Sequence, residues 1–250
     1  MTDMKNADVP EGGAPLMQPS RSVTRPLLVQ IVAYVVLVAL ACIPGSANVG
    51  GVVYSLLLSV VGVLIMLSAF FTPLRDGLPG RIIACVLGFC SMICAATPFL
   101  GELVFGVHPD GVERSESLSV SAWLAGCATL LVMLLVVSFA RQMARNPRTD
   151  MIVQMSHMVM DGVSCIAAAG WCFLPMLMHA DGVRPVVRAL ALAAVALVAL
   201  ALAAMSCLWT RDVRPLDDAR SPWIGMGMMP VMLTGAAVGI AVLVMLAYRN

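Results

Sequence analysis

Charged side chains are scarce in this chain of 250 residues, where Asp, Glu, Lys and Arg together make up 12% of the sequence. A soluble domain normally carries about 25% charged residues, so the composition excludes a water-covered globule. Lysine is almost absent, with Lys5 as the single example, which excludes a retinal-type Schiff base in any apolar segment. The net charge of +1 gives no support for binding of nucleic acid.

Cysteine is missing from every polar connection. All eight cysteines lie inside apolar segments, so the sequence offers no disulfide framework of the kind found in small secreted domains. The chain also lacks the phosphate-binding P-loop, the HExxH zinc motif and the Gly-x-Ser-x-Gly nucleophile turn. These absences favour a protein without catalytic activity.

Long apolar runs dominate the rest of the chain, and hydrophobic residues make up 60% of it. A helix needs about 20 such residues to cross a bilayer, and seven runs approach or exceed that length. They cover residues 27–43, 52–71, 82–106, 120–140, 152–178, 186–208 and 223–247. Helices satisfy their own backbone hydrogen bonds in lipid, so we expect an all-helical, multi-pass membrane bundle. Six spans would result if one of the runs of unusual length lay at the membrane–water interface and did not cross the bilayer.

The basic residues indicate an orientation. Eleven of the fifteen Lys and Arg residues fall in the first 25 residues or in the second, fourth and sixth connections. Cytoplasmic loops retain Lys and Arg, so the N-terminus is predicted to be cytoplasmic. Residues 1–25 are polar and without hydrophobic periodicity, which predicts a disordered cytoplasmic tail before a transmembrane domain over 26–250. The excess of Arg over Lys and the many Ala and Val residues are typical of GC-rich bacteria, so we expect a bacterial cytoplasmic membrane.

A short motif, His-x-Asp-Gly-Val, occurs twice, each time in a predicted outer connection. The copies start at His108 and His179, and a weaker copy starts at Asn48. Their spacing suggests an internal repeat of three helical hairpins followed by a seventh helix. The competing interpretation is convergence, because Asp-Gly is a common turn signal.

The same motif forms a candidate metal site. If the hairpins pack side by side, four side chains would meet at the outer face: His108, Asp110, His179 and Asp181. Imidazole and carboxylate ligands suit zinc or another divalent ion. The alternative is structural, since at a helix end His also caps carbonyls and Asp-Gly forms turns.

A second candidate site lies in the fifth span. His157 and Asp161 are four residues apart and therefore share one helical face. A carboxylate inside the bilayer is costly and commonly lines a proton or ion pathway. The alternative is that the embedded part starts near Val159, which would leave both residues at the cytoplasmic interface beside Arg145 or Arg148. Glu102, near the outer end of the third span, presents the same two alternatives.

Methionine is abundant, with 19 residues. Two clusters fall in the inner halves of the fifth and seventh spans and could face each other: Met155, Met158 and Met160, and Met226, Met228, Met229 and Met232. Thioethers favour Cu(I), but methionine is also an ordinary, flexible filler of apolar gaps.

These features predict a multi-pass membrane protein that binds or translocates a small solute, an ion or a lipid, with Asp161 and His157 in the pathway. Two alternatives stay open. One is a non-catalytic subunit or scaffold that associates with itself or with other membrane proteins through small-residue faces such as 191–204. The other is a metal-dependent membrane enzyme built on the outer His and Asp residues.

Overall fold

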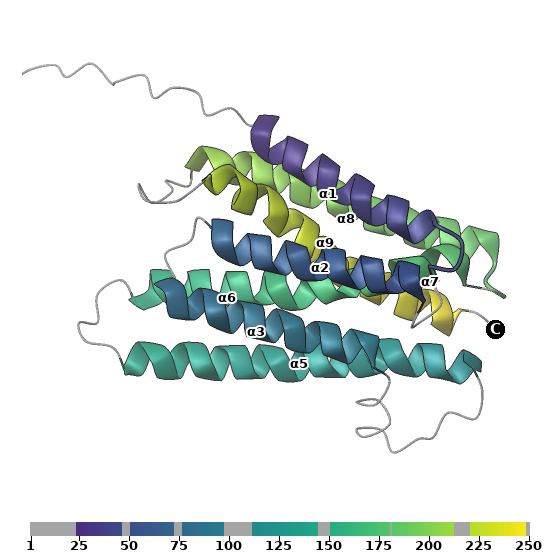
Figure 1. Ribbon diagram of the computed structural model, residues 1–250, viewed down its shortest axis with the longest axis horizontal. Coiled ribbons are helices and arrows are strands. Elements are labelled where there is room, and N and C mark those ends of the chain that lie inside the picture. The colour runs from purple at the N-terminus through teal and green to yellow at the C-terminus, as the bar shows by residue number, and fades with distance from the viewer. Residues whose placement is uncertain are drawn as a thin grey trace, which may run out of the picture.

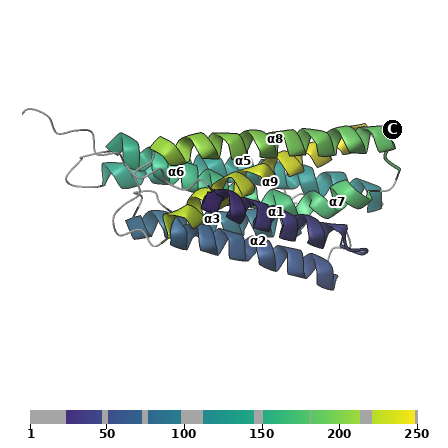
Figure 2. The ribbon, with the colours of Figure 1, turned by 90° about the horizontal axis from the view of Figure 1, so that it is seen from above.

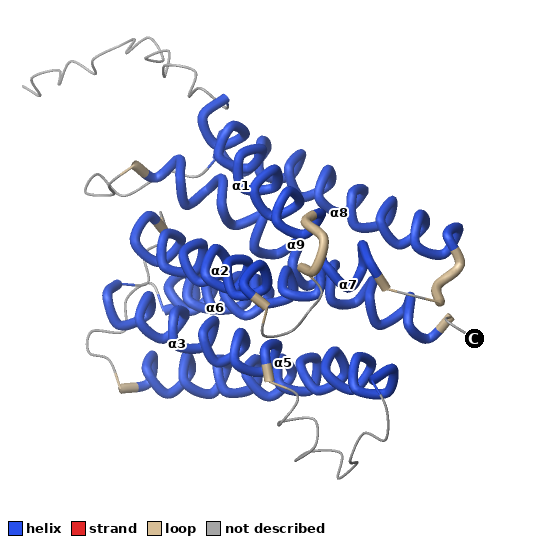
Figure 3. The backbone as a smooth tube through the Cα atoms, turned by 45° about the vertical axis from the view of Figure 1, so that its right-hand side comes forward, coloured by secondary structure: helices blue, strands red, loops and turns tan. Residues whose placement is uncertain are grey.

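The structure is a computed structural model that describes residues 24–46, 51–72, 77–97, 112–144, 151–180, 182–212 and 221–248. Within these ranges all regular secondary structure is helical (Figure 3). The elements are α1 (Thr24–Cys42), α2 (Val52–Phe71), α3 (Gly77–Ala96), α5 (Val112–Met143), α6 (Met151–Ala168), the 3₁₀ segment η1 (Ala169–Phe173), α7 (Leu174–His179), α8 (Pro185–Asp212) and α9 (Pro222–Ala247). The expected all-helical class is confirmed for the described part of the chain.

Within the described ranges, seven helical segments are long and apolar enough to cross a membrane, as the sequence predicts. Six of them match the predicted spans within a few residues, and α6, η1 and α7 together form the fifth, Ile152–His179. The third span differs from its prediction. It begins at Gly77, because Pro79 is well placed in a first helical turn, and ends at Ala96, because Pro98 disfavours helical backbone at Thr97.

The helices lie side by side along the long axis of the molecule (Figure 1). We call the end where α1, α3, α6 and α9 begin the proximal end, on the left in Figure 1, and the other end the distal end. Helix α9 runs obliquely through the bundle and contacts α1, α2, α5, α6, η1, α7 and α8. Figure 2 shows α9 between α8 on one side and α1 and α2 on the other.

Burial differs sharply between the spans and separates the core from the surface. In the fifth span 83% of the most apolar window is buried, against 6% in α8. The exposed side chains of α8 are apolar, including Leu197, Leu200 and Met205. An apolar face of this kind suits contact with lipid, so α8 lies on the outside of the bundle, while α9 and the fifth span form its core.

Glycine allows α9 to approach the fifth span closely. A Cβ atom on Gly170 would overlap the carbonyl oxygen of Gly235, and a Cβ atom on Gly235 would overlap the carbonyl oxygen of Ala167. Small residues let helix backbones approach in this way where lipid provides no hydrophobic driving force between helices. Among the contacts made at glycine positions, the crossing of η1 and α9 is therefore the tightest.

The turn before α8 contains part of the second motif copy. Gly182 has a φ of +74°, which is the left-handed backbone that glycine adopts readily and that an Asp-Gly turn uses. Asn48, His108, Asp110 and Asp181 lie outside the described residues, so the internal repeat stays a prediction. All eight cysteines are described, and none of them forms a disulfide bond within the described part of the chain.

Candidate functional site

Asp161 is a buried carboxylate near the proximal end. Its side chain is 8% exposed, and the hydroxyl of Thr72 lies 2.9 Å and 3.1 Å from its two carboxylate oxygens. Thr72 directly follows α2 and is itself 4% exposed. A hydroxyl that donates to a charged acceptor in a dry environment makes one of the stronger hydrogen bonds available to a protein.

Arg81 belongs to the same group of side chains. Its Nη2 atom lies 3.5 Å from the backbone carbonyl oxygen of Thr72, so α2, α3 and α6 meet at this point. The nearby guanidinium of Arg141, from the last turn of α5, lies 3.3 Å from the sulfur of Met158. We call Thr72, Arg81 and Asp161 the proximal polar cluster.

The contact with Thr72 defines the position of Asp161 along the bundle. Asp161 lies ten positions after the start of α6, which is about 15 Å along the helix. Because it contacts Thr72, it is nevertheless level with the end of α2. His157, one turn earlier and half-buried, then lies still closer to the proximal end. Arg145 and Arg148, the expected neighbours, lie outside the described residues.

The outer candidate metal site is described only at His179. This residue ends α7, and its Nδ1 atom lies 3.2 Å from the carbonyl oxygen of Pro175 in the same helix. Among the residues that the structure describes, no three His, Cys, Asp or Glu side chains group closely enough to hold a metal ion. His108, Asp110 and Asp181 are outside that set, as is Glu102, so their convergence stays a prediction.

Pro230, which lies inside α9, is not among the residues predicted to be functional. Proline has no backbone N–H, so it removes the hydrogen bond that the carbonyl of Met226 would accept from position 230. The hydroxyl of Ser206, from α8, lies 3.5 Å from that carbonyl oxygen. The sequence signal was present, because a proline in the middle of an apolar run indicates a local break.

Side chains of α9 itself, of α1 and of η1 form hydrogen bonds beside this proline. Thr234 Oγ1 donates to the carbonyl of Pro230 at 2.8 Å, and Tyr34 Oη, from α1, lies 2.8 Å from Thr234 Oγ1. Trp171 Nε1, from η1, donates to the carbonyl of Val231 at 2.8 Å. Lipid provides no donors for backbone carbonyls, so an irregular helix inside a membrane depends on such partners. We call Pro230 and these neighbouring carbonyls the α9 break.

The fifth span is irregular at the same crossing. Its α-helix gives way to the 3₁₀ segment η1 at Ala169, and Ser91 Oγ, from α3, donates to the carbonyl of Ile166 at 2.8 Å. A 3₁₀ stretch within a helix often marks a hinge or a functional position. Two irregular spans thus cross each other, and the Trp171 side chain of one donates to the backbone of the other.

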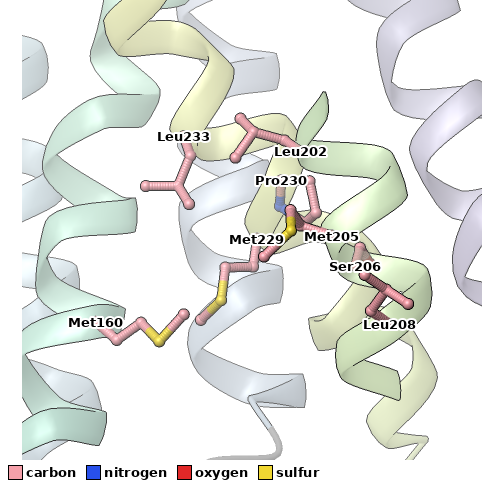
Figure 4. A pocket seen from close by; sticks show the side chains of 8 residues that line it. All are labelled: Met160, Leu202, Met205, Ser206, Leu208, Met229, Pro230 and Leu233. Carbon is pink, nitrogen blue, oxygen red and sulfur yellow. The ribbon is translucent and has the colours of Figure 1, made fainter. Parts of the chain in front are cut away.

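A cavity of about 340 Å³ lies beside the α9 break. Figure 4 shows its lining: Met160 from α6, Leu202, Met205, Ser206 and Leu208 from α8, and Met229, Pro230 and Leu233 from α9. A second cavity of about 570 Å³ shares Met160 and Leu233 with the first and continues along α6 past Met155 to Ile152. The first cavity is lined by α6, α8 and α9, and the second by α6 and α9; we call the two adjoining cavities the groove.

The methionine clusters meet in this groove only in part. Met160 and Met229 line the same cavity, as the sequence suggested, and Met155 lines the adjoining one. Met228 and Met232 belong to the buried core instead. The groove gains a methionine from α8, Met205, which sequence reasoning missed because its own helix shows no methionine cluster.

No family model, curated protein or solved structure matches this chain. Its role is therefore inferred from its own geometry. That geometry offers two places with functional potential, which are the proximal polar cluster and the groove beside the α9 break. The first can hold or exchange a proton through a carboxylate. The second can enclose a largely apolar molecule next to a small number of hydrogen-bonding groups.

Proposed function

We propose that this multi-pass membrane protein binds a lipid-soluble molecule in the groove and moves it within or across the bilayer. One observation carries the proposal: the groove borders the α9 break, where the central helix departs from regular hydrogen bonding. Membrane transport proteins commonly build their sites from discontinuous helices, because irregular backbone is tolerated where it lines a cavity or is buried in protein.

The lining defines the chemistry of the ligand. Seven of the eight side chains around the first cavity are apolar, and Ser206 supplies the hydroxyl. The rim of the groove carries exposed apolar residues, with Ile152 85% and Leu208 56% exposed, so a molecule dissolved in the bilayer can enter sideways without crossing a polar barrier. The three methionines of the first cavity give a wall that adapts to the shape of its occupant.

Asp161 and His157 supply the second part of the proposal. With a cytoplasmic N-terminus, the proximal polar cluster would lie at the cytoplasmic side of the bundle, where Asp161 would exchange a proton during transport and His157 would connect it to water. The burial of Asp161 and its hydroxyl partner support this role, because ionisable groups buried within membrane proteins frequently mark proton relays. An Asp161→Asn variant should fold and bind the ligand but stop proton-linked transport.

A scaffold is the second candidate, favoured by the apolar surface of α8. Only 6% of the apolar window of this helix is buried, and residues 191–204 are rich in alanine. Small residues allow a partner helix or a second copy of the chain to approach closely. A scaffold should keep its assembly and its function in the Asp161→Asn variant, which separates it from a proton-linked carrier.

Native mass spectrometry of the protein in nanodiscs tests the groove. We expect one lipid-soluble molecule to remain bound, and Leu202→Trp, which fills the first cavity, to remove it. The matched control is Leu200→Trp, on the same helix but 71% exposed and outside the lining, which should retain the molecule. Bound copper in place of an organic molecule would contradict the proposal that the ligand is lipid-soluble. Equal retention of the molecule by both variants would contradict its placement in the groove.

A further inference from the structure

Ser206, on α8, carries the hydroxyl of the first cavity, whose seven other lining side chains are apolar (Figure 4). Its Oγ atom accepts a hydrogen bond from Nε2 of Gln30, on α1, at 3.0 Å. Both side chains are buried, with Gln30 2% and Ser206 5% exposed, so the bond is shielded from water. This bond determines which part of the Ser206 hydroxyl remains for a molecule in the cavity.

The hydrogen of the Ser206 hydroxyl is only weakly held within the protein. The acceptor that it reaches is the backbone carbonyl oxygen of Met226, on α9, and the two oxygens are 3.5 Å apart. Hydrogen bonds from a hydroxyl to an oxygen are normally about 2.5–3.0 Å long, so this one is stretched. An acceptor oxygen in the cavity at the normal distance would form the stronger bond with this hydrogen.

Gln30 makes Ser206 a better donor. Hydrogen bonds in a dry environment polarise one another along a chain. The amide that donates to Ser206 Oγ strengthens the hydroxyl as a donor and weakens its second lone pair as an acceptor. Gln30 is not part of the lining, so it is a positioning residue that acts through Ser206.

We propose that the molecule in the groove carries an uncharged carbonyl oxygen, as in a ketone, a quinone or an ester, and that Ser206 donates a hydrogen bond to it. This inference rests on the proposed function, because it names the ligand class of the same groove. A carboxylate or phosphate does not fit, since no described cationic side chain lines either cavity and an unpaired charge in a dry site is very costly. An alcohol fits less well, because the only side-chain oxygen among the described lining residues of the first cavity is the already engaged Ser206 Oγ.

Three probes with the same number of carbon atoms test this specificity: methyl tridecyl ketone, the corresponding secondary alcohol and pentadecane. Native mass spectrometry of the full-length chain in nanodiscs measures the binding of each. We expect the ketone to bind about three- to tenfold more tightly than pentadecane, which is the gain from one hydrogen bond, with the alcohol in between. Equal affinities for the ketone and pentadecane, or a preference for the alcohol, would contradict the donor role of Ser206.

Two variants and a spectroscopic signature locate the hydrogen bond. Ser206→Ala should abolish the preference for the ketone without weakening the binding of pentadecane, and Gln30→Met should reduce the preference in part. The matched control, Ser138→Ala on α5, removes a buried hydroxyl outside both linings and should keep the full preference. In infrared spectra, the ¹³C-labelled carbonyl of the bound ketone should absorb at a lower wavenumber than in protein-free nanodiscs, and Ser206→Ala should remove this shift. An unshifted band in the unmodified protein would overturn the proposal.

The outcomes separate this inference from the proposed function. Equal affinities for all three probes, each abolished by Leu202→Trp, would keep the groove as a binding site and remove only its specificity. Unchanged binding of every probe in Leu202→Trp would contradict the groove itself. The mass of the co-purified molecule distinguishes an ester lipid from a quinone, and a co-purified hydrocarbon without oxygen would overturn the carbonyl class.

Discussion

At the scale of single residues, Thr72 holds the buried carboxylate of Asp161 in place. Replacing Thr72 by Val keeps the side-chain shape but removes the hydroxyl that donates to the carboxylate of Asp161. A buried acceptor that loses a donor costs about 1–3 kcal/mol, so the free energy of unfolding should fall by that amount. Chemical unfolding in detergent, followed by fluorescence, measures the change.

Thr97→Val is the matched control for this residue. Thr97 is exposed, and its hydroxyl donates to the carbonyl of Ile93 within its own helical turn. Exposed substitutions of this kind change stability by about 0.5 kcal/mol or less. Equal losses of unfolding free energy in the two variants would show that the hydrogen bond to Asp161 stabilises the protein no more than an exposed one does.

At the scale of the helices, the crossing of η1 and α9 depends on glycine. Gly235→Ala would place a methyl group against the carbonyl oxygen of Ala167, which is backbone and cannot move aside cheaply. Overpacking of this kind typically costs about 1–3 kcal/mol, and the Tm should fall clearly. Gly62→Ala, on α2, is the matched control, because its new methyl group would meet only ordinary contacts at 3.5 Å and beyond. That variant should be neutral or gain up to about 1 kcal/mol from helix propensity.

The helices themselves were predictable from the sequence, and their mutual contacts were not. Apolar runs locate spans because bilayer thickness fixes their length, and only the third needed a substantial correction. Asp161 stood out as a rare carboxylate in an apolar run, but its partner Thr72 is 89 positions away and leaves no local signal. Gln30 and Ser206 are 176 positions apart, so their meeting is likewise a property of packing. Pro230 is different, since its effect on α9 can be inferred from the proline alone.

At the scale of the whole molecule, the distribution of basic residues between the two ends of the bundle matches the directions of the helices. Arg25, Arg81 and Arg141 lie at the proximal end, in the first or last turns of their helices, whereas Arg184 and Arg188 lie at the distal end, where α8 begins. Cytoplasmic retention of arginine therefore predicts that the proximal end is cytoplasmic. It would place the proximal polar cluster and the α9 break in the cytoplasmic half of the bundle.

Reporter fusions test this orientation and the number of spans together. With seven spans and a cytoplasmic N-terminus, alkaline phosphatase fused after residue 250 should be active, because the enzyme needs an oxidising compartment to form its disulfides. A green fluorescent protein fused at the same place should be dark. The control is a pair of fusions after Arg145, in the predicted cytoplasmic connection between α5 and α6, where the two reporters should behave in the opposite way. An inactive phosphatase at both places would contradict the seven-span arrangement, and a simultaneous reversal of both pairs would contradict the orientation while keeping the span count.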